Sequence, residues 1–368
     1  MKNFSLSTSS DFSTEIESLR GLAALFVLFG HLYLVAQAAV FFPAATPKAL
    51  KIFIASVFNP QPAVLLFFAI SGLVLGRQLR KNPVDSIPSY FAYLLRRGFR
   101  LMPLIWVSVV FAFLLFPFYE VSFSILYKNL KLKDISLNIV LWSIRVELWC
   151  SLFFPLLFWL FRIQGIKLNI LLFLGFTLMS YFVNNPIFMQ FWVFFHAGLL
   201  IDALSANVKI NFLKNPLILV IAYLIFILAP EFSIGLRNWN YGCWQSWVLP
   251  EIVACSYILF FVIHNKNSAF NSFLRHSWIR YFGKISFSIY LLHFPLLKFM
   301  IWKFPITSLA NLISFATIFF VITIALSALA YRFIELPFNQ LGRKLANYLV
   351  KDLFSKSLPE TNSKLQEI

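Results

Sequence analysis

Two ionisable residues near the start of the chain, Arg20 and His31, are separated by ten residues that are all apolar or glycine. In an α-helix this spacing places both side chains on one face, about 20° apart around the axis and about 16 Å apart along it. If the helix spans a membrane, the arginine lies at one surface and the histidine near the middle of the bilayer. An ionisable group at that depth is costly and usually marks a functional site. The spacing therefore predicts chemistry inside the bilayer.

His31 is the candidate catalytic base. A hydroxyl group is a poor nucleophile until a base removes its proton, and histidine is the side chain best matched to that task near neutral pH. We expect His31 to accept the proton of an acceptor hydroxyl. Two alternatives remain open at this stage. The histidine could form a covalent intermediate, or it could only hold two helices together by a hydrogen bond.

A second ionisable residue, Glu147, is expected at a depth comparable to that of His31. Its carboxylate could orient the imidazole, stabilise the protonated imidazole or bind acceptor hydroxyls, so we include it among the catalytic candidates. The alternative is a structural pairing with a basic group elsewhere. Ser71, Tyr290 and His293 are weaker candidates for substrate binding, and His293 could equally form a packing hydrogen bond.

Arg20, Arg97 and Arg100 are candidates for phosphate binding, because a guanidinium group binds phosphate oxygens in pairs. The case is weaker for Arg97 than for the other two. All three could instead fix the membrane topology and contact lipid phosphates. We expect no metal site, since no two histidines share helical spacing and no carboxylate cluster is present in the sequence.

The composition indicates the elements that position these residues. The chain is 60% hydrophobic and 12% charged, whereas soluble domains carry about 25% charged residues. Repeated apolar runs approach the length of about 20 residues that spans a bilayer as a helix. The runs lack the alternation of a membrane β-barrel. The sequence therefore predicts an all-α integral membrane protein, a polytopic helical bundle.

Ten transmembrane spans are expected, with an additional interfacial turn at about residues 51–58. The spans are placed at about residues 20–40, 61–79, 101–118, 138–160, 168–183, 187–203, 216–230, 247–263, 285–302 and 309–330. The apolar stretch 22–35 is taken as part of a retained span rather than a cleaved signal peptide. We expect a transmembrane domain at 1–345 and a short polar cytoplasmic tail at 346–368.

The basic residues predict the orientation. With both termini in the cytoplasm, the cytoplasmic segments hold 22 of the 31 Lys and Arg residues and the outer segments hold seven. This bias follows the positive-inside rule. The net charge of +17 is then an orientation signal and an attraction to anionic lipid, and it does not indicate nucleic-acid binding.

Six motifs, in order along the chain, resemble the acyltransferase-3 family of bacterial membrane acyltransferases. They are Glu17-Ser-Leu-Arg20-Gly21 through His31, Phe67-Phe68-Ala-Ile-Ser71-Gly72, Arg97-Gly-Phe-Arg100-Leu-Met-Pro103, Trp142-Ser143 with Glu147 and Pro155, Gly283-Lys284-Ile-Ser286 through Tyr290 and His293 to Pro295, and Glu335-Leu-Pro337. Leu148-Trp149 departs from the polar-aromatic pair that usually follows the glutamate. The motifs cover nearly the whole chain.

The resemblance implies transfer of an acyl group, most often acetyl, from cytoplasmic acyl-CoA to a hydroxyl of an extracytoplasmic or lipid-linked glycan. Acyl-CoA is then the co-substrate, with its phosphates on Arg20, Arg97 and Arg100 and its thioester attacked by the hydroxyl that His31 activates. The chain resembles the form without an SGNH hydrolase domain, in the bacterial inner (plasma) membrane.

Two other functions remain possible from the sequence. A transporter or flippase of a lipid-linked molecule would also need intramembrane ionisable residues, and a sensory module could use them to set a conformational equilibrium. The oligomeric state does not follow from the sequence.

Overall fold

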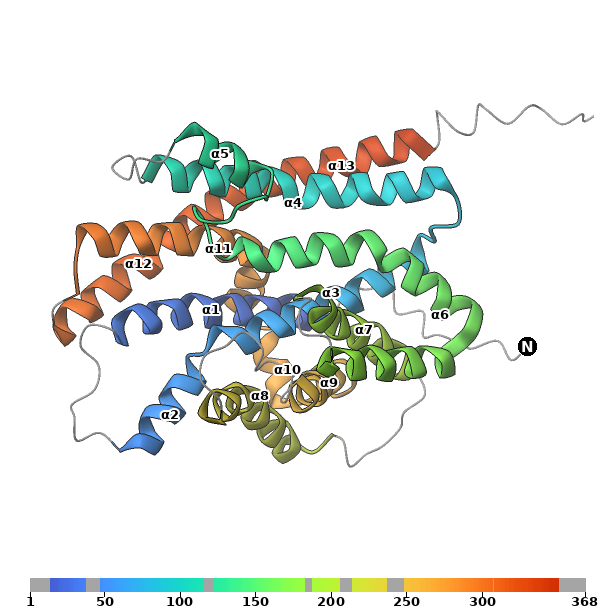
Figure 1. The fold of residues 1–368 in the computed structure, drawn as a ribbon, viewed down its shortest axis with the longest axis horizontal. Coiled ribbons are helices and arrows are strands. Elements are labelled where there is room, and N and C mark those ends of the chain that lie inside the picture. The colour runs from blue at the N-terminus through green and yellow to red at the C-terminus, as the bar shows by residue number, and fades with distance from the viewer. Residues whose placement is uncertain are drawn as a thin grey trace, which may run out of the picture.

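The computed structural model describes residues 14–37, 47–115, 122–182, 187–205, 214–236, 248–306 and 308–350. Within these ranges the regular structure is entirely helical (Figure 1). The elements are α1 (Thr14–Gln37), α2 (Lys48–Val57), α3 (Pro60–Lys81), α4 (Ile87–Leu115), α5 (Phe123–Leu130), α6 (Leu141–Phe182), α7 (Ile187–Ser205), α8 (Pro216–Leu236), α9 (Val248–His264), α10 (Ala269–Leu274), α11 (Ser277–Lys303), α12 (Leu309–Ala330), the π-helical turn η3 (Tyr331–Glu335) and α13 (Leu336–Tyr348). The predicted all-α membrane fold is confirmed.

Each of the ten predicted spans falls on a helix, but they differ in length. Within the described ranges, six helical segments are long and apolar enough to cross a membrane: Thr14–Val35, Ala49–Lys81, Ile87–Leu115, Leu141–Arg162, Ser277–Lys303 and Ala310–Tyr348. The other four predicted spans correspond to shorter apolar helices, at Gly165–Met179, Phe191–Leu204, Pro216–Ala229 and Leu249–His264. A count of ten complete crossings therefore stays a prediction.

Some boundaries differ from those expected. The predicted spans 138–160 and 168–183 lie on the single element α6, which bends at Gly165, where φ is +72°. That left-handed conformation costs glycine little, so the chain reverses without a loop. The expected interfacial turn is the helix α2. At the other end, α13 continues to Tyr348, past the expected domain end at residue 345, and residues 351–368 of the predicted tail lie outside the described ranges.

Helices α1 and α11 form a close parallel pair. A Cβ atom added at Gly21 would lie 2.4 Å from the backbone nitrogen of Gly283, so the two backbones approach as closely as they do only because both residues are glycine. Ten residues further along each helix, His31 faces His293. Both contacts join residues that are the same number of positions apart in the chain, so the two helices run in the same direction. The first and ninth predicted spans must be parallel if successive spans cross the membrane in alternating directions.

Helices α3 and α7 form a second parallel pair. Gly72 lies against the backbone of Phe195, and four residues later Gly76 lies against Leu199. Near the end of α7, Asp202 forms an ion pair with Arg77 of α3, in which Nε and Oδ1 are 2.8 Å apart. The two pairs together form the centre of the bundle, with α1 and α3 adjacent in Figure 1.

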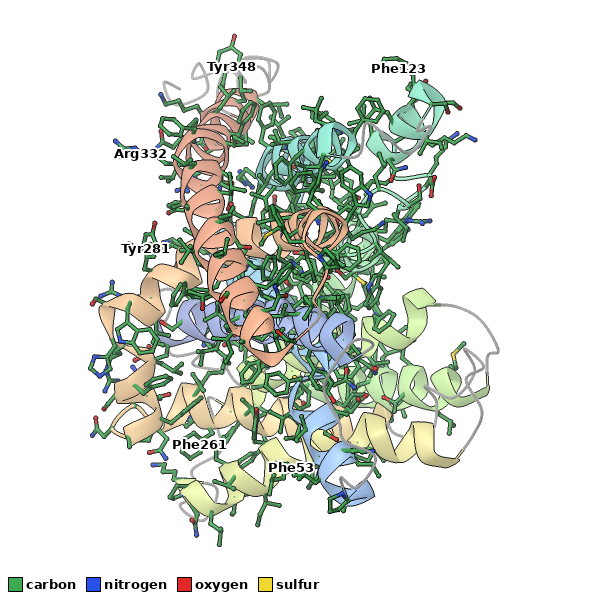
Figure 2. All side chains as sticks on the ribbon, turned by 90° about the vertical axis from the view of Figure 1, so that its left-hand side faces the viewer. Phe53, Phe123, Phe261, Tyr281, Arg332 and Tyr348 are labelled. Atoms are coloured by element: carbon green, nitrogen blue, oxygen red, sulfur yellow. The ribbon has the colours of Figure 1, made fainter. Side chains whose placement is uncertain are left out.

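Large apolar side chains cover the outside of the bundle. Phe53 on α2 and Phe123 on α5 are 47% and 79% exposed, and they lie at opposite edges of the view in Figure 2. Leu114 and Ile313 on spanning segments are also more than 60% exposed. Exposed apolar surface of this extent is typical of a protein surrounded by lipid.

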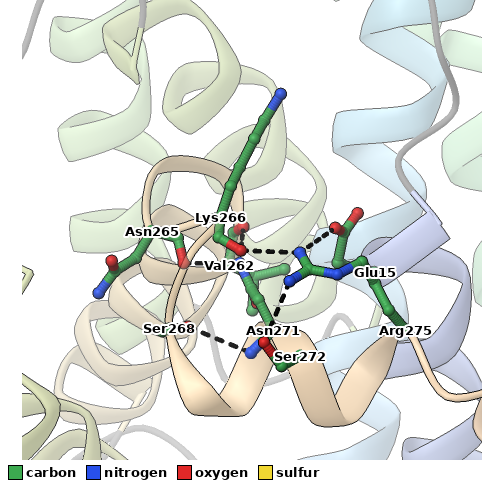
Figure 3. A network of polar contacts seen from close by, with 8 residues as sticks. All are labelled: Glu15, Val262, Asn265, Lys266, Ser268, Asn271, Ser272 and Arg275. Atoms are coloured by element: carbon green, nitrogen blue, oxygen red, sulfur yellow. Dashed lines mark hydrogen bonds and ion pairs between the residues drawn. The ribbon is translucent and has the colours of Figure 1, made fainter.

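A polar network fixes the start of α1 against the connection between α9 and α11 (Figure 3). The guanidinium of Arg275 donates to Glu15 Oε1 at 3.1 Å and to the carbonyl of Lys266 at 2.7 Å. Asn271 on α10 donates to the carbonyls of Val262 and Asn265. The contact from Arg275 holds the start of α1 at Glu15, and the bonds from Asn271 close the turn between α9 and α10.

Candidate active site

The two central histidines form a direct contact between α1 and α11. His31 Nδ1 lies 3.1 Å from His293 Nε2, and the ring centroids are 5.1 Å apart. His293 is fully buried, whereas His31 is half-buried. The rings of Phe294 and His31 make a T-shaped contact, with centroids 5.2 Å apart. The predicted base therefore has a side-chain partner that the sequence placed only among the weaker candidates.

The hydrogen bonds indicate which nitrogens carry protons. His293 Nδ1 lies 3.0 Å from the carbonyl oxygen of Ile289, and a carbonyl only accepts, so the proton belongs on Nδ1 and Nε2 is left as an acceptor. His31 Nδ1 faces two acceptors, this Nε2 and the carbonyl oxygen of Val27 at 3.0 Å. The proton of neutral His31 is thus assigned to Nδ1. Its Nε2 then carries the lone pair that a general base needs.

Tyr290 connects the histidine pair to α6. It lies one helical turn before His293, with ring centroids 6.0 Å apart. Its hydroxyl is 2.6 Å from Ser143 Oγ and donates to the carbonyl of Val140 at 3.2 Å. Since Ser143 and Glu147 are four residues apart on α6, they share a face of that helix. Polar groups therefore extend from the histidines along α6.

Glu147 lies at the far end of this series, where it pairs with an arginine. Arg97 Nη2 donates to Glu147 Oε1 at 3.0 Å and to Ser151 Oγ at 2.5 Å. Ser71 Oγ donates to the same carboxylate oxygen at 3.4 Å. The antiparallel packing of α4 on α6 makes this contact possible, because it sets Arg97 opposite the face that carries Glu147 and Ser151. The side-chain hydrogen-bond partner of His31 is His293 and not Glu147, and a catalytic role for Glu147 stays a prediction.

Arg20 and Arg100 lie beside this ion pair without forming one themselves. Both are half-buried and interact electrostatically with Glu147 and Glu335. Among the described residues, neither guanidinium has a carboxylate within the 4 Å of an ion pair, whereas Arg97 does. The three predicted phosphate ligands thus lie close together. Of these, Arg97 is paired with a carboxylate, and Arg20 and Arg100 form no ion pair with the described residues. Arginines in this state are suited to bind an anion.

Within the described ranges, no three His, Cys, Asp or Glu side chains are grouped so that they could hold a metal ion. The expectation that the protein uses no metal stays a prediction.

The sequence model of a known family, described as an acyltransferase domain, matches residues 13–332. The chain belongs to the acyltransferase-3 family. No curated protein and no solved structure matches the chain. Family membership together with the apolar helices identifies it as a multi-pass membrane acyltransferase.

In this acyltransferase the predicted site residues form two groups. His31, His293 and Tyr290 lie together on α1 and α11, and Ser71, Glu147 and the arginines lie together at the junction of α1, α3, α4 and α6. Ten residues of α1 separate Arg20 in the second group from His31 in the first. Helix α1 thus connects the two groups of candidate site residues.

The sequence does not predict several residues that contact the candidate site. Ser143 and Ser151 occur on the motif helix but were not singled out, and both bond directly to candidate site residues. Glu335, in the last motif, is buried and accepts a hydrogen bond from Ser288 on α11. For Ser143 and Ser151, their spacing of four residues on either side of Glu147 is the signal that identifies them.

Proposed function

We propose that this acyltransferase transfers an acyl group, most simply acetyl, from cytoplasmic acyl-CoA to a hydroxyl of an extracytoplasmic or lipid-linked glycan. His31 is the general base, and both termini lie in the cytoplasm of a bacterium whose inner membrane holds the protein. The observation that carries the proposal is the His31–His293 contact, since it leaves His31 Nε2 as an acceptor on the helix that also carries Arg20.

The chemical step balances with these groups. His31 Nε2 removes the proton of the acceptor hydroxyl as its oxygen attacks the thioester carbonyl. The carbon–sulfur bond then breaks, the new ester forms, and the protonated His31 returns its proton to the departing thiolate to give free CoA. His293 stays neutral and acts by holding the His31 ring, which fixes the direction of the lone pair.

The arginines account for recognition of the donor. CoA carries its phosphates and its thioester at opposite ends of a long flexible arm. The step of eleven residues from Arg20 to His31 corresponds to about 16 Å of helix. Phosphates bound by Arg20 and Arg100 therefore leave the thioester end to extend along the interior toward His31. Arg97 is held by Glu147 and contributes mainly by adding positive potential.

The test uses the protein purified into lipid nanodiscs with radiolabelled acetyl-CoA and lipid-linked saccharide extracted from the producing cells. His31→Ala is expected to abolish label transfer while the variant still inserts and remains monodisperse. His276→Ala, which alters an exposed histidine at the start of α11, is the matched control and should transfer at the parental rate. Parental transfer by His31→Ala would remove His31 from the mechanism.

The donor and the acceptor are tested in the same preparation. A series of acyl-CoA thioesters of increasing chain length identifies the acyl group, and mass spectrometry of the labelled product identifies the acceptor. Parental protein that consumes no acyl-CoA with any lipid-linked saccharide, yet moves that saccharide across the nanodisc, would contradict the proposal and support a flippase.

A further inference from the structure

Pro295 leaves a carbonyl of α11 without its helical donor. Proline has no N–H, so the carbonyl four residues earlier loses its hydrogen bond. In α11 that carbonyl belongs to Leu291, which is fully buried and lies two residues before His293. In a membrane interior an unsatisfied backbone carbonyl is costly, because no water is present to replace the missing donor.

A side chain from a different part of the chain replaces the missing donor. Asn138 Nδ2 donates to the carbonyl oxygen of Leu291 at 2.9 Å. Asn138 is fully buried, and its Oδ1 has no hydrogen-bond partner among the described residues. The side chain of Asn138 therefore bonds to the described residues only through its donor group, Nδ2. This group also makes a longer contact to Ser108 Oγ, at 3.4 Å.

The connection that carries Asn138 is held by its own hydrogen bonds. Asn129 at the end of α5 accepts from the backbone N–H of Leu137, the residue before Asn138, at 3.2 Å. Asp134 accepts from the backbone N–H groups of Ile135 and Ser136. The hydroxyl of Ser136 also donates to this carboxylate, and that bond lowers the pKa of Asp134. Asn138 thus reaches α11 from a constrained segment.

The same arrangement occurs at a second proline of the site. Pro155 in α6 removes the donor for the carbonyl of Ser151. Tyr93 from α4 donates its hydroxyl to that carbonyl at 2.8 Å, and Tyr90 donates to the neighbouring carbonyl of Leu152 at 3.0 Å. Ser151 in turn holds Arg97. At both prolines a side chain of another segment satisfies the freed carbonyl beside a candidate site residue.

We infer that Asn138 is a positioning residue, which holds the bent part of α11 so that His293 Nε2 stays in contact with His31. This inference rests on the proposed function, in which His31 acts only while its ring is held in one orientation. Loss of the donor would let α11 move to find another partner for the Leu291 carbonyl, and His293 follows because it belongs to the same turn.

The test is a double-mutant cycle between Asn138 and Pro295. Asn138→Ala is expected to lower kcat about tenfold or more, because small displacements of positioning groups have effects of this order, with KM for acetyl-CoA unchanged. Pro295→Ala restores a backbone N–H that can bond the Leu291 carbonyl. In the Asn138→Ala background it should therefore recover most of the lost kcat, whereas in the parental protein it gives no gain.

The cycle is measured on kcat and on the midpoint of thermal unfolding in the same nanodiscs. Coupling in the midpoint reports the hydrogen bond itself, so it is informative even if the parental protein transfers no acyl group, a result that would refute the proposed function alone. Asn271→Ala is the control, because it also removes an amide donor to buried carbonyls but does so at the other end of α1 (Figure 3). It should lower the midpoint without changing kcat and without rescue by Pro295→Ala.

Two results would overturn the inference. One is a parental kcat in Asn138→Ala. The other is additivity of the two substitutions in both measurements. If Asn138→Ala does not accumulate, Asn138→Asp enters the cycle instead, since it keeps the volume but replaces the donor with an acceptor. A parental kcat in Asn138→Asp would then refute the donor role.

Discussion

The close contact between α1 and α11 gives a direct test of how the histidine pair is held. Alanine at position 21 would place its Cβ 2.4 Å from the backbone nitrogen of Gly283, whereas non-bonded heavy atoms need about 3.5 Å. The helices must therefore separate by about 1 Å. Such a shift lengthens the 3.1 Å contact between His31 and His293 to about 4 Å, beyond hydrogen-bond range.

We expect Gly21→Ala to lower kcat about 100-fold, the order that a displacement of about 1 Å produces in a catalytic arrangement. The stability effect has two parts. Overpacking costs about 1–3 kcal/mol, and the higher helix propensity of alanine returns about 1 kcal/mol. The net loss of folding free energy is therefore about 0–2 kcal/mol, below the roughly 2.7 kcal/mol of activation free energy that a 100-fold fall in kcat represents.

The assay compares Gly21→Ala with Gly175→Ala, because a Cβ added at Gly175 meets no atom within 4 Å. Acetyl transfer and thermal unfolding are measured for both in nanodiscs. Gly175→Ala should keep the parental kcat and be slightly more stable. Equal kcat values for the two variants would refute the reasoning, since they would show that the separation of α1 and α11 does not control the histidine contact.

Three further predictions concern the arginine end of the site. Arg20→Ala should raise KM for acetyl-CoA about tenfold or more and leave KM for the acceptor unchanged, because the lost contact is a charge-assisted hydrogen bond; equal effects on both would contradict phosphate binding. Tyr93→Phe leaves the Ser151 carbonyl unsatisfied and should reduce the free energy of unfolding by about 1–3 kcal/mol, as measured by thermal unfolding. Glu147→Gln should lower KM for acetyl-CoA, because it removes the negative charge beside the three guanidinium groups, whereas a fall in kcat alone would support the catalytic role predicted from the sequence.

The helices could be predicted from the sequence because the apolar runs are long and the turn residues between them are distinct. The predicted spans that begin at about residues 61 and 216 match α3 and α8, which begin at Pro60 and Pro216. A single glycine between two apolar runs does not distinguish a loop from a sharp bend. The sequence therefore predicts a break between residues 160 and 168, where α6 continues through a bend at Gly165. The local sequence thus locates both apolar segments. The angle between them depends on the backbone dihedral of Gly165, which the sequence does not specify.

The site was predictable where its residues share one helix. Arg20 and His31 are related by helical geometry alone, so their common face follows from their spacing. The pairing of Arg97 with Glu147 depends on the register between α4 and α6, which no local pattern specifies. For the same reason the sequence left His293 as a weak candidate, although it is the residue that contacts His31.

The distribution of charge explains why a histidine, rather than a carboxylate, orients His31. A carboxylate beside the imidazole would place an ionised group in the bilayer interior, where its desolvation is costly unless it is fully paired. A neutral His293 supplies an acceptor for the Nδ1 proton without that cost, and its own proton is satisfied by the Ile289 carbonyl. Glu147 instead lies where arginines neutralise it. In the proposed mechanism the interior end of the site is therefore neutral at rest, and charge would develop there only as His31 takes the acceptor proton.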